Sequence, residues 1–172
     1  MTIRSDGAQV EKAAGAALSF EMRFCPSAEL IGIVRQFVVA FYRRVTHDED
    51  IASRLAVATH ELLENAVKYS SDGAANLFVQ VHPSSRAVDV KVSNRASDAQ
   101  IALLRARFDE IGDAADAQQH YAALLKRTAL VQTGSGGLGL ARIWAESEMA
   151  MRLTTAGDSV EIHAHGAIGT QS

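Results

Sequence analysis

The stretch HELLENAVKYS, residues 60–70, carries a carboxylate and a carboxamide one helical turn apart, on Glu61 and Asn65. Side chains four residues apart lie on the same face of a helix, and Lys68 follows on nearly the same side. An amide oxygen can bind Mg²⁺ while water and phosphates fill its other positions. A nearby carboxylate can orient or deprotonate a hydroxyl nucleophile. A solvated helix face is the alternative interpretation of these residues.

A glycine-rich segment further along the chain could complete such a site. GSGGLGLARIW places Gly134, Gly136, Gly137 and Gly139 where a helix is expected to begin. Glycines let backbone N–H groups approach a ligand closely, and a helix N-terminus favours phosphate. The segment is not a P-loop, because no Lys-Ser/Thr pair follows it. A flexible connector is the alternative, and the segment indicates a phosphate site only in combination with the acid and amide helix.

The elements that must position these residues alternate between strands and helices. Two helix starts carry the capping-box pattern, Thr46 with Glu49 and Ser97 with Gln100. Strands are expected at 17–24, 76–82, 87–94 and twice within 149–165, and helices at 28–45, 46–69, 97–110, 113–132 and 138–148. The pattern predicts one α/β domain over residues 17–172, after a flexible N-terminus of residues 1–16.

Composition and charge limit the classes of partner. The 172 residues contain 17 Lys and Arg against 20 Asp and Glu, so nucleic acid is not an expected partner. The only cysteine, Cys25, excludes a disulfide framework and fits a reducing compartment. No apolar run approaches the roughly 20 residues that span a bilayer, and we see no signal peptide. We therefore expect a cytoplasmic protein without a membrane partner.

Two histidines near the end of the chain lie two residues apart. His163 and His165 fall in an expected strand and therefore share one of its faces. The spacing would allow a pair of metal ligands, but no third ligand is apparent in the sequence. The only metal ligand that we predict is therefore Asn65, for Mg²⁺.

The two motifs together resemble those of the GHKL superfamily of ATP-binding domains. ELLENAVKYS is similar to the N box of that family, E-x-x-x-N-A-x-K-[HY], and GGLGLARI to its second glycine-rich box. The resemblance covers about residues 17–165. It implies a Bergerat-type fold, a two-layer α/β sandwich with a mixed sheet packed on helices. Without a phosphoacceptor helix or a transducer domain, the chain is most similar to anti-sigma-factor serine kinases and the related SiaB-type kinases.

This resemblance implies ATP and Mg²⁺ as cofactors and assigns roles to the matching residues. Glu61 occupies the position of the catalytic glutamate, Asn65 that of the Mg²⁺ ligand, and Lys68 a position near the phosphates. The glycine turn around the phosphates corresponds to Gly134, Gly136, Gly137, Leu138 and Gly139.

The first glycine-rich box of the family, D-x-G-x-G, is missing. After the strand at 87–93 the chain reads VSNRASD, which places Asn94 at the position of the adenine-binding aspartate and removes both glycines. An asparagine can accept a hydrogen bond from an adenine amino group, without the charge assistance of a carboxylate. The resemblance also places an ATP lid between Asn94 and Gly134, where this sequence predicts two helices.

The resemblance implies an ATP-binding regulator of a bacterial partner-switching pathway, either a serine/threonine protein kinase or an anti-sigma factor, or both. Its partners would be a STAS-domain anti-sigma-factor antagonist, a sigma factor, or both, and a homodimer is compatible with the resemblance. The intact N box favours the enzyme, whereas the missing box favours a non-catalytic interaction module with a degenerate nucleotide site. A detached histidine-kinase catalytic domain is a third interpretation, and the sequence leaves the choice open.

Overall fold

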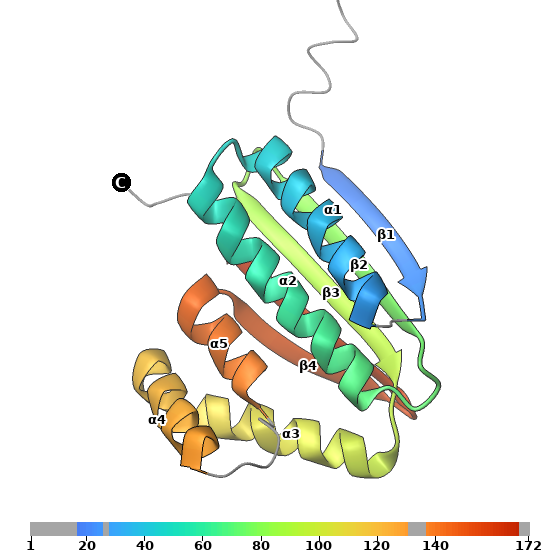
Figure 1. The fold of residues 1–172 in the computed structure, drawn as a ribbon, viewed down its shortest axis with the longest axis vertical. Helices are drawn as coiled ribbons and strands as arrows, with labels where there is room; N and C mark the ends of the chain where they lie inside the picture. The colour runs from blue at the N-terminus through green and yellow to red at the C-terminus, as the bar shows by residue number, and fades with distance from the viewer. Residues whose placement is uncertain (1–16, 26–27, 131–136, 169–172) are drawn as a thin grey trace, which may run out of the picture.

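The fold is a two-layer α/β sandwich, seen in a computed structural model that describes residues 17–25, 28–130 and 137–168 (Figure 1). The predicted N-terminal segment 1–16 lies outside these residues, as do Gly134 and Gly136. The elements are β1 (Leu18–Phe24), α1 (Ala28–Thr46), α2 (Glu49–Tyr69), β2 (Ala75–His82), β3 (Ala87–Arg95), α3 (Asp98–Asp113), α4 (Ala117–Leu130), α5 (Leu138–Ser147), β4 (Ala150–Ala156) and β5 (Ser159–Ala167). Within the described residues, no helix is long and apolar enough to cross a membrane.

The sheet has the strand order β1-β2-β3-β5-β4, and every neighbouring pair is antiparallel. The prediction of a mixed sheet is therefore wrong, because all of its neighbouring strands are antiparallel. Strand β4 does run in the same direction as β3, as expected after a helical crossover. However, β5 turns back from β4 and pairs between the two, so no parallel pair forms.

The core lies between one face of the sheet and the helices. Alternate residues of the strands point into it because side chains along a strand alternate between the two faces. The buried strand residues are Leu77, Val79 and Val81 of β2, Val88, Val90 and Val92 of β3, and Val160, Ile162 and Ala164 of β5. Helices α1, α2 and α5 cover this face (Figure 1), and α2 contributes Leu62 and Leu63, which are almost completely buried. Among the described residues, no helix covers the opposite face of the sheet (Figure 1).

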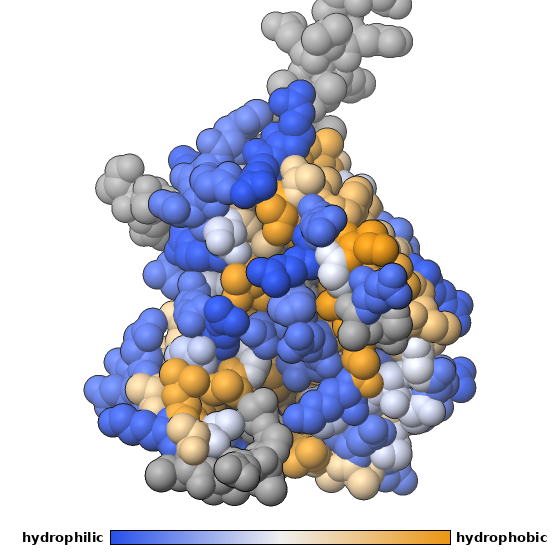
Figure 2. All heavy atoms as spheres, in the orientation of Figure 1, coloured by the Kyte–Doolittle hydropathy of each residue, from blue (hydrophilic) through white to orange (hydrophobic). Residues whose placement is uncertain are grey.

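Strand β1, at one edge, is held against α1 by aromatic rings. The ring of Phe20 lies 4.9 Å from those of Phe37 and Phe41, in edge-to-face contact with both, a favoured geometry. Large apolar side chains that stay exposed are Leu18, Ile33, Phe37, Val67, Leu103 and Leu125. Figure 2 shows apolar patches separated by hydrophilic surface on the helical face, so this face is not uniformly polar.

The two predicted capping boxes have different outcomes. Ser97 and Gln100 form the expected reciprocal bonds at the start of α3. At α2 the prediction is wrong, because the cap is Asp48, whose carboxylate accepts from the Ile51 N–H at 3.0 Å. The hydroxyl of Thr46 instead donates to the Tyr42 carbonyl at 2.8 Å, at the end of α1.

Replacing a core residue of α2 should destabilise the fold strongly. We expect Leu62→Ala to lower the free energy of unfolding by about 2–5 kcal/mol, because it removes buried methyl groups and leaves a cavity. Leu103→Ala is the matched control, since Leu103 is 42% exposed, and it should change the value by less than about 0.5 kcal/mol. Urea denaturation followed by circular dichroism measures both. Equal losses would show that α2 does not form the centre of the core.

Candidate functional site

Helix α5 lies against α2 at the level of the predicted acid and amide pair. A Cβ atom on Gly139 would stand 2.5 Å from Oε2 of Glu61 and 3.6 Å from Nδ2 of Asn65. The first distance is too short for any carbon–oxygen contact, so the two helices approach this closely because residue 139 is a glycine. The glycine-rich motif therefore contacts the acid and amide motif at Gly139.

The carboxylate of Glu61 is held by a residue that the sequence reasoning missed. Nη1 of Arg142 lies 3.0 Å from Oε1 of Glu61, and Nε of Arg142 lies 2.8 Å from Oε2 of Glu146. Hydrogen bonds to Glu146 and then to Glu61 raise the pKa of Arg142, so its guanidinium stays charged. The available signal was helical spacing, since Arg142 follows Gly139 by three residues and lies on the same face of α5.

The side chain of Asn65 is buried without a partner for its nitrogen. Asn65 is 9% exposed, and its Nδ2 finds no hydrogen-bond acceptor among the described residues. A buried polar group left without a partner costs about 1–3 kcal/mol. A bound group that meets this carboxamide would remove that cost, and the amide can offer either its oxygen or its nitrogen.

A cavity of about 470 Å³ opens beside these residues. Its lining includes Glu61, Asn65 and Lys68 of α2, Gly139 of α5 and Arg35 of α1. The volume falls within the roughly 300–1,000 Å³ that is usual for ligand sites. The ammonium of Lys68 is exposed and lies 5.5 Å from the centre of the Tyr69 ring. The structure thus brings four of the predicted site residues to one cavity, and Arg35 adds a second cationic side chain beside Lys68.

The start of α5 is formed by Gly137, which is buried and has φ = 93°. This left-handed conformation favours glycine, and a glycine at the N-cap has no side chain with which to cap the helix. A first helical turn that begins at Leu138 without a side-chain cap leaves backbone N–H groups available to an anion. This is the part of the predicted glycine turn that the structure describes.

Helix α3 brings a second unpredicted arginine to the start of α5. A Cβ atom on Gly137 would stand 2.8 Å from Cδ of Arg107. The Nε atom of Arg107 is buried and lacks a partner among the described residues, while its Nη1 lies 2.9 Å from Glu110 Oε2. Burial raises the pKa of Tyr69, and the nearby charge of Arg107 opposes that shift. The segment predicted as a lid therefore places a cation beside the glycine turn.

The second helix of that segment packs on α5. Nε2 of Gln118 donates to the Ala145 carbonyl at 2.7 Å, and the ring of His120 lies 6.3 Å from that of Trp144. Burial, followed by the negative charge of Glu146, raises the pKa of Tyr121, so this phenol stays neutral. Both predicted helices are present as α3 and α4, and α4 is anchored on the helix that carries the glycine turn.

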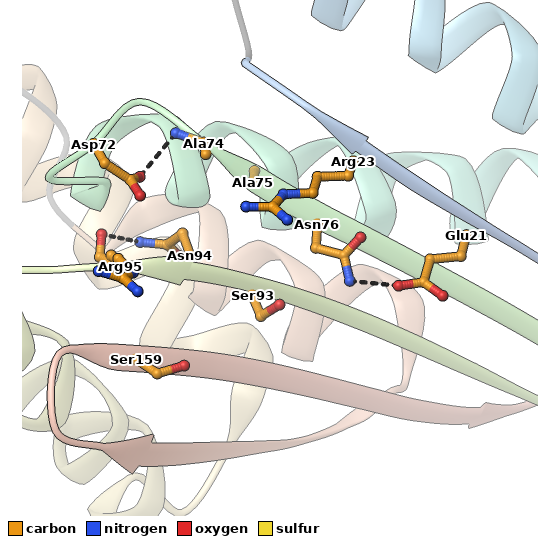
Figure 3. A pocket seen from close by; sticks show the side chains of 10 residues that line it. All are labelled: Glu21, Arg23, Asp72, Ala74, Ala75, Asn76, Ser93, Asn94, Arg95 and Ser159. Atoms are coloured by element: carbon orange, nitrogen blue, oxygen red, sulfur yellow. Dashed lines mark hydrogen bonds between the residues drawn. The ribbon is translucent and has the colours of Figure 1, made fainter.

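Asn94 does not line the cavity of Glu61, Asn65 and Lys68. It lines a different cavity, of about 280 Å³, together with Asp72, Ser93 and Arg95 (Figure 3). Its Nδ2 donates to the carbonyls of Tyr69 at 3.2 Å and Arg95 at 3.0 Å. These bonds fix the nitrogen and leave the side-chain oxygen as an acceptor, so the adenine contact at Asn94 stays a prediction.

Comparison with known proteins shows which solved structures have a similar fold. The sequence matches no family model and no curated protein. A solved structure is similar: a chain in the crystal structure of the SiaB–SiaC complex from Pseudomonas aeruginosa. The TM-score is 0.60 at 16% sequence identity, over 98% of this chain and 100% of that one. The two chains share a fold. The match supports the predicted two-layer α/β architecture over nearly the whole chain.

Substitution of Gly139 should disturb the contact between α2 and α5. We expect Gly139→Ala to displace Glu61 and to lower the free energy of unfolding by about 1–3 kcal/mol, as overpacking usually does. Gly112→Ala in α3 is the control, because nothing lies within 4 Å of its Cβ position. The control should leave stability unchanged or raise it by up to about 1 kcal/mol, given the helix propensity of alanine. Thermal denaturation compares the two, and equal stabilities would contradict the close approach.

Proposed function

We propose that the chain binds a nucleoside triphosphate with Mg²⁺ between α2 and α5 and acts as a regulator in a bacterial partner-switching pathway. The observation that carries this proposal is the buried carboxamide of Asn65 beside the glycine start of α5, with an Nδ2 that lacks a partner among the described residues and can donate to a phosphate oxygen. A helix N-terminus without a side-chain cap attracts phosphate, and a carboxamide oxygen is a ligand that Mg²⁺ accepts. Two independent features of the same cavity therefore favour the same class of ligand.

The residues around the cavity fit ATP in type and charge. Asn65 would bind Mg²⁺, and the N–H groups of the turn at Gly137, Leu138 and Gly139 would receive phosphate oxygens. Lys68 and Arg35, which both line the cavity, supply positive charge that offsets the phosphates. When bound, Mg-ATP supplies a γ-phosphoryl group that a hydroxyl can accept.

Glu61 is the candidate catalytic residue of a serine/threonine protein kinase. Its carboxylate would orient the hydroxyl of a partner's serine or threonine and take its proton. In the structure that carboxylate is paired with Arg142, which is also bonded to Glu146 on its own helix. Arg142 can therefore release Glu61 and keep a partner. Positioning and charge stabilisation would provide most of the rate enhancement, as in other phosphoryl transfers.

The partner class rests on the resemblance and on the shared fold. The similar chain was crystallised in a complex of two proteins, SiaB and SiaC, which supports a role in protein–protein regulation. For this chain we propose a STAS-domain antagonist, a sigma factor, or both as partners, with the protein acting in the cytoplasm as a kinase or an anti-sigma factor. Whether it also forms a homodimer is a separate question that size-exclusion chromatography with light scattering would answer.

A non-catalytic interaction module is the second candidate function. The pairing of Glu61 with Arg142 at 3.0 Å favours it, because the carboxylate is then occupied by a cation instead of a substrate hydroxyl. Asn94 in place of an aspartate favours it as well, since the adenine contact then lacks charge assistance. The two functions differ in whether ATP is bound and in whether a phosphoryl group is transferred.

Nucleotide binding is tested by calorimetry with millimolar ATP, with and without Mg²⁺. We expect wild type to bind Mg-ATP, and Asn65→Ala to lose the dependence on Mg²⁺ while its circular dichroism stays that of a folded protein. Gln80→Ala is the matched control, because Gln80 lies on β2 and lines neither the cavity of Asn65 nor that of Asn94. Absence of heat with wild type would reject the nucleotide proposal and favour the interaction module.

Phosphoryl transfer is tested with Glu61→Gln, which keeps the shape of the side chain and removes its charge. We expect transfer of radiolabel to a STAS-domain partner to slow by roughly 100-fold or more if Glu61 acts as a base, with ATP affinity nearly unchanged. Glu49→Gln is the control, because this carboxylate lies at the other end of α2, pairs with Arg43 and does not line the cavity. Transfer by Glu61→Gln at the wild-type rate would exclude Glu61 as the base. Tight binding of a sigma factor without any transfer by wild type would establish the interaction module.

A further inference from the structure

The face of the sheet away from the helices carries a cluster of histidines around one aspartate. Along β3, Val88 and Val90 are buried against the helices, so Asp89 between them points to the opposite face. Along β5, Ile162 and Ala164 are buried in the same way, which turns His163 and His165 outward. Because β3 and β5 are paired with Asp89 opposite His165, the three outward side chains meet on adjacent strands.

The three groups are close enough to share one ion. Nε2 of His163 lies 2.7 Å and Nδ1 of His165 lies 2.9 Å from Oδ1 of Asp89. The three atoms that could act as ligands all lie within 4.8 Å of one another. Ligands of a tetrahedral zinc ion, at about 2.0–2.1 Å from the metal, stand about 3.3 Å apart. Admitting an ion would therefore lengthen the two nitrogen–oxygen distances by about 0.4–0.6 Å and bring the two nitrogens to about 3.3 Å from each other.

We propose that Asp89, His163 and His165 form a binding site for a divalent transition-metal ion, zinc above all. Two imidazoles and one carboxylate are a zinc ligand set that leaves a fourth position for water. The side chains are partly buried, with exposed fractions of 18% for Asp89 and 30% for His163, while that of His165 is 56%. Asp89 and His163 are thus held by the sheet, and the open position faces solvent.

A fourth residue, His82 at the end of β2, orients the carboxylate. Its Nε2 lies 3.0 Å from Oδ2 of Asp89, the oxygen that the other two histidines leave free. A hydrogen bond to the second oxygen of a ligating carboxylate fixes its rotation, and such partners commonly change metal affinity by about 10- to 100-fold. His82 is therefore a positioning residue and not one of the ligands.

The neighbouring charges do not close the site to a cation. Lys91 of β3 is paired in register with the ligand His163, but its ammonium lies 5.9 Å from the centre of the Phe78 ring. Phe78 belongs to β2, whereas the two histidine ligands belong to β5. Arg152 of β4 is paired in register with His163 and is exposed, so solvent and salt weaken its repulsion.

This site is separate from the proposed nucleotide site. The cavity of Glu61 and Asn65 is lined by α1, α2 and α5, which cover the other face of the sheet (Figure 1). The metal that we propose here binds two imidazole nitrogens and one carboxylate oxygen, whereas the Mg²⁺ of the nucleotide proposal binds oxygen ligands alone. A result that rejects ATP binding would therefore not reject the metal site, and a result that rejects the metal site would not reject ATP binding.

The test is calorimetric titration of untagged, chelator-stripped full chain with Zn²⁺, supported by the visible absorption of bound Co²⁺. A Cys25→Ser background removes the exposed lone thiol as a competing ligand. We expect one equivalent of Zn²⁺, Co²⁺ bands of tetrahedral type, and loss of both in His163→Ala and in Asp89→Asn. His82→Ala should weaken binding by about 10- to 100-fold without changing the stoichiometry.

His120→Ala is the matched control, because His120 lies on α4 beside Trp144 and should leave Zn²⁺ affinity unchanged. Circular dichroism of each variant confirms that it is folded. The proposal is overturned if wild type takes up no Zn²⁺ or if Asp89→Asn and His163→Ala bind it as tightly as wild type. Equal loss in His120→Ala would likewise reject it, by showing that the ion binds elsewhere.

Discussion

The close approach of α5 to α2 at Gly139 is the constraint on which the candidate nucleotide site depends. Helix α2 packs on the sheet through residues such as Leu62 and Leu63, and its remaining side faces α1 and α5. A side chain at 139 would collide with the Glu61 carboxylate, 2.5 Å from the Cβ position. With glycine there, α5 can shield Asn65 from water and bring Arg142 to Glu61. The glycine thus leaves room for the Glu61 carboxylate, which pairs with Arg142 of α5.

Much of the fold could be predicted because its signals are local. The alternation of valines in β2 and β3 gave both strands to within a residue, and the cap at Ser97 was correct because both of its partners lie within four residues. The mixed sheet was wrong because strand pairing is decided by distant contacts. Nothing in the sequence of β5 shows that it inserts between β3 and β4. The cap at Thr46 failed through local competition, since Asp48 offers a carboxylate while the threonine hydroxyl bonds back to Tyr42.

In the candidate site, too, local signals could be read from the sequence and distant contacts could not. Glu61, Asn65 and Lys68 share a helix face by their spacing alone, and the structure places all three at one cavity. Arg142 and Arg107 could not be placed, because their positions depend on how α5 and α3 pack on the rest of the molecule. Asn94 was linked to the other residues through the family pattern, and the structure puts it at a separate cavity. Sequence spacing therefore identified groups within one element, whereas partners on different elements required the fold.

The histidine cluster shows how one pair of strands can serve two purposes. In β3 and β5 the inward residues, such as Val90 and Ala164, provide the core, and the outward ones, such as Asp89 and His163, contribute little to it. Substitutions on an exposed face usually change stability by no more than about 0.5 kcal/mol, so the core does not require histidine at these positions. Three imidazoles around one carboxylate carry a desolvation cost that alternating small polar residues would avoid. The two-residue period of the strands thus allows the outward face to bind a ligand independently of the packing that holds α2 and α5 in place.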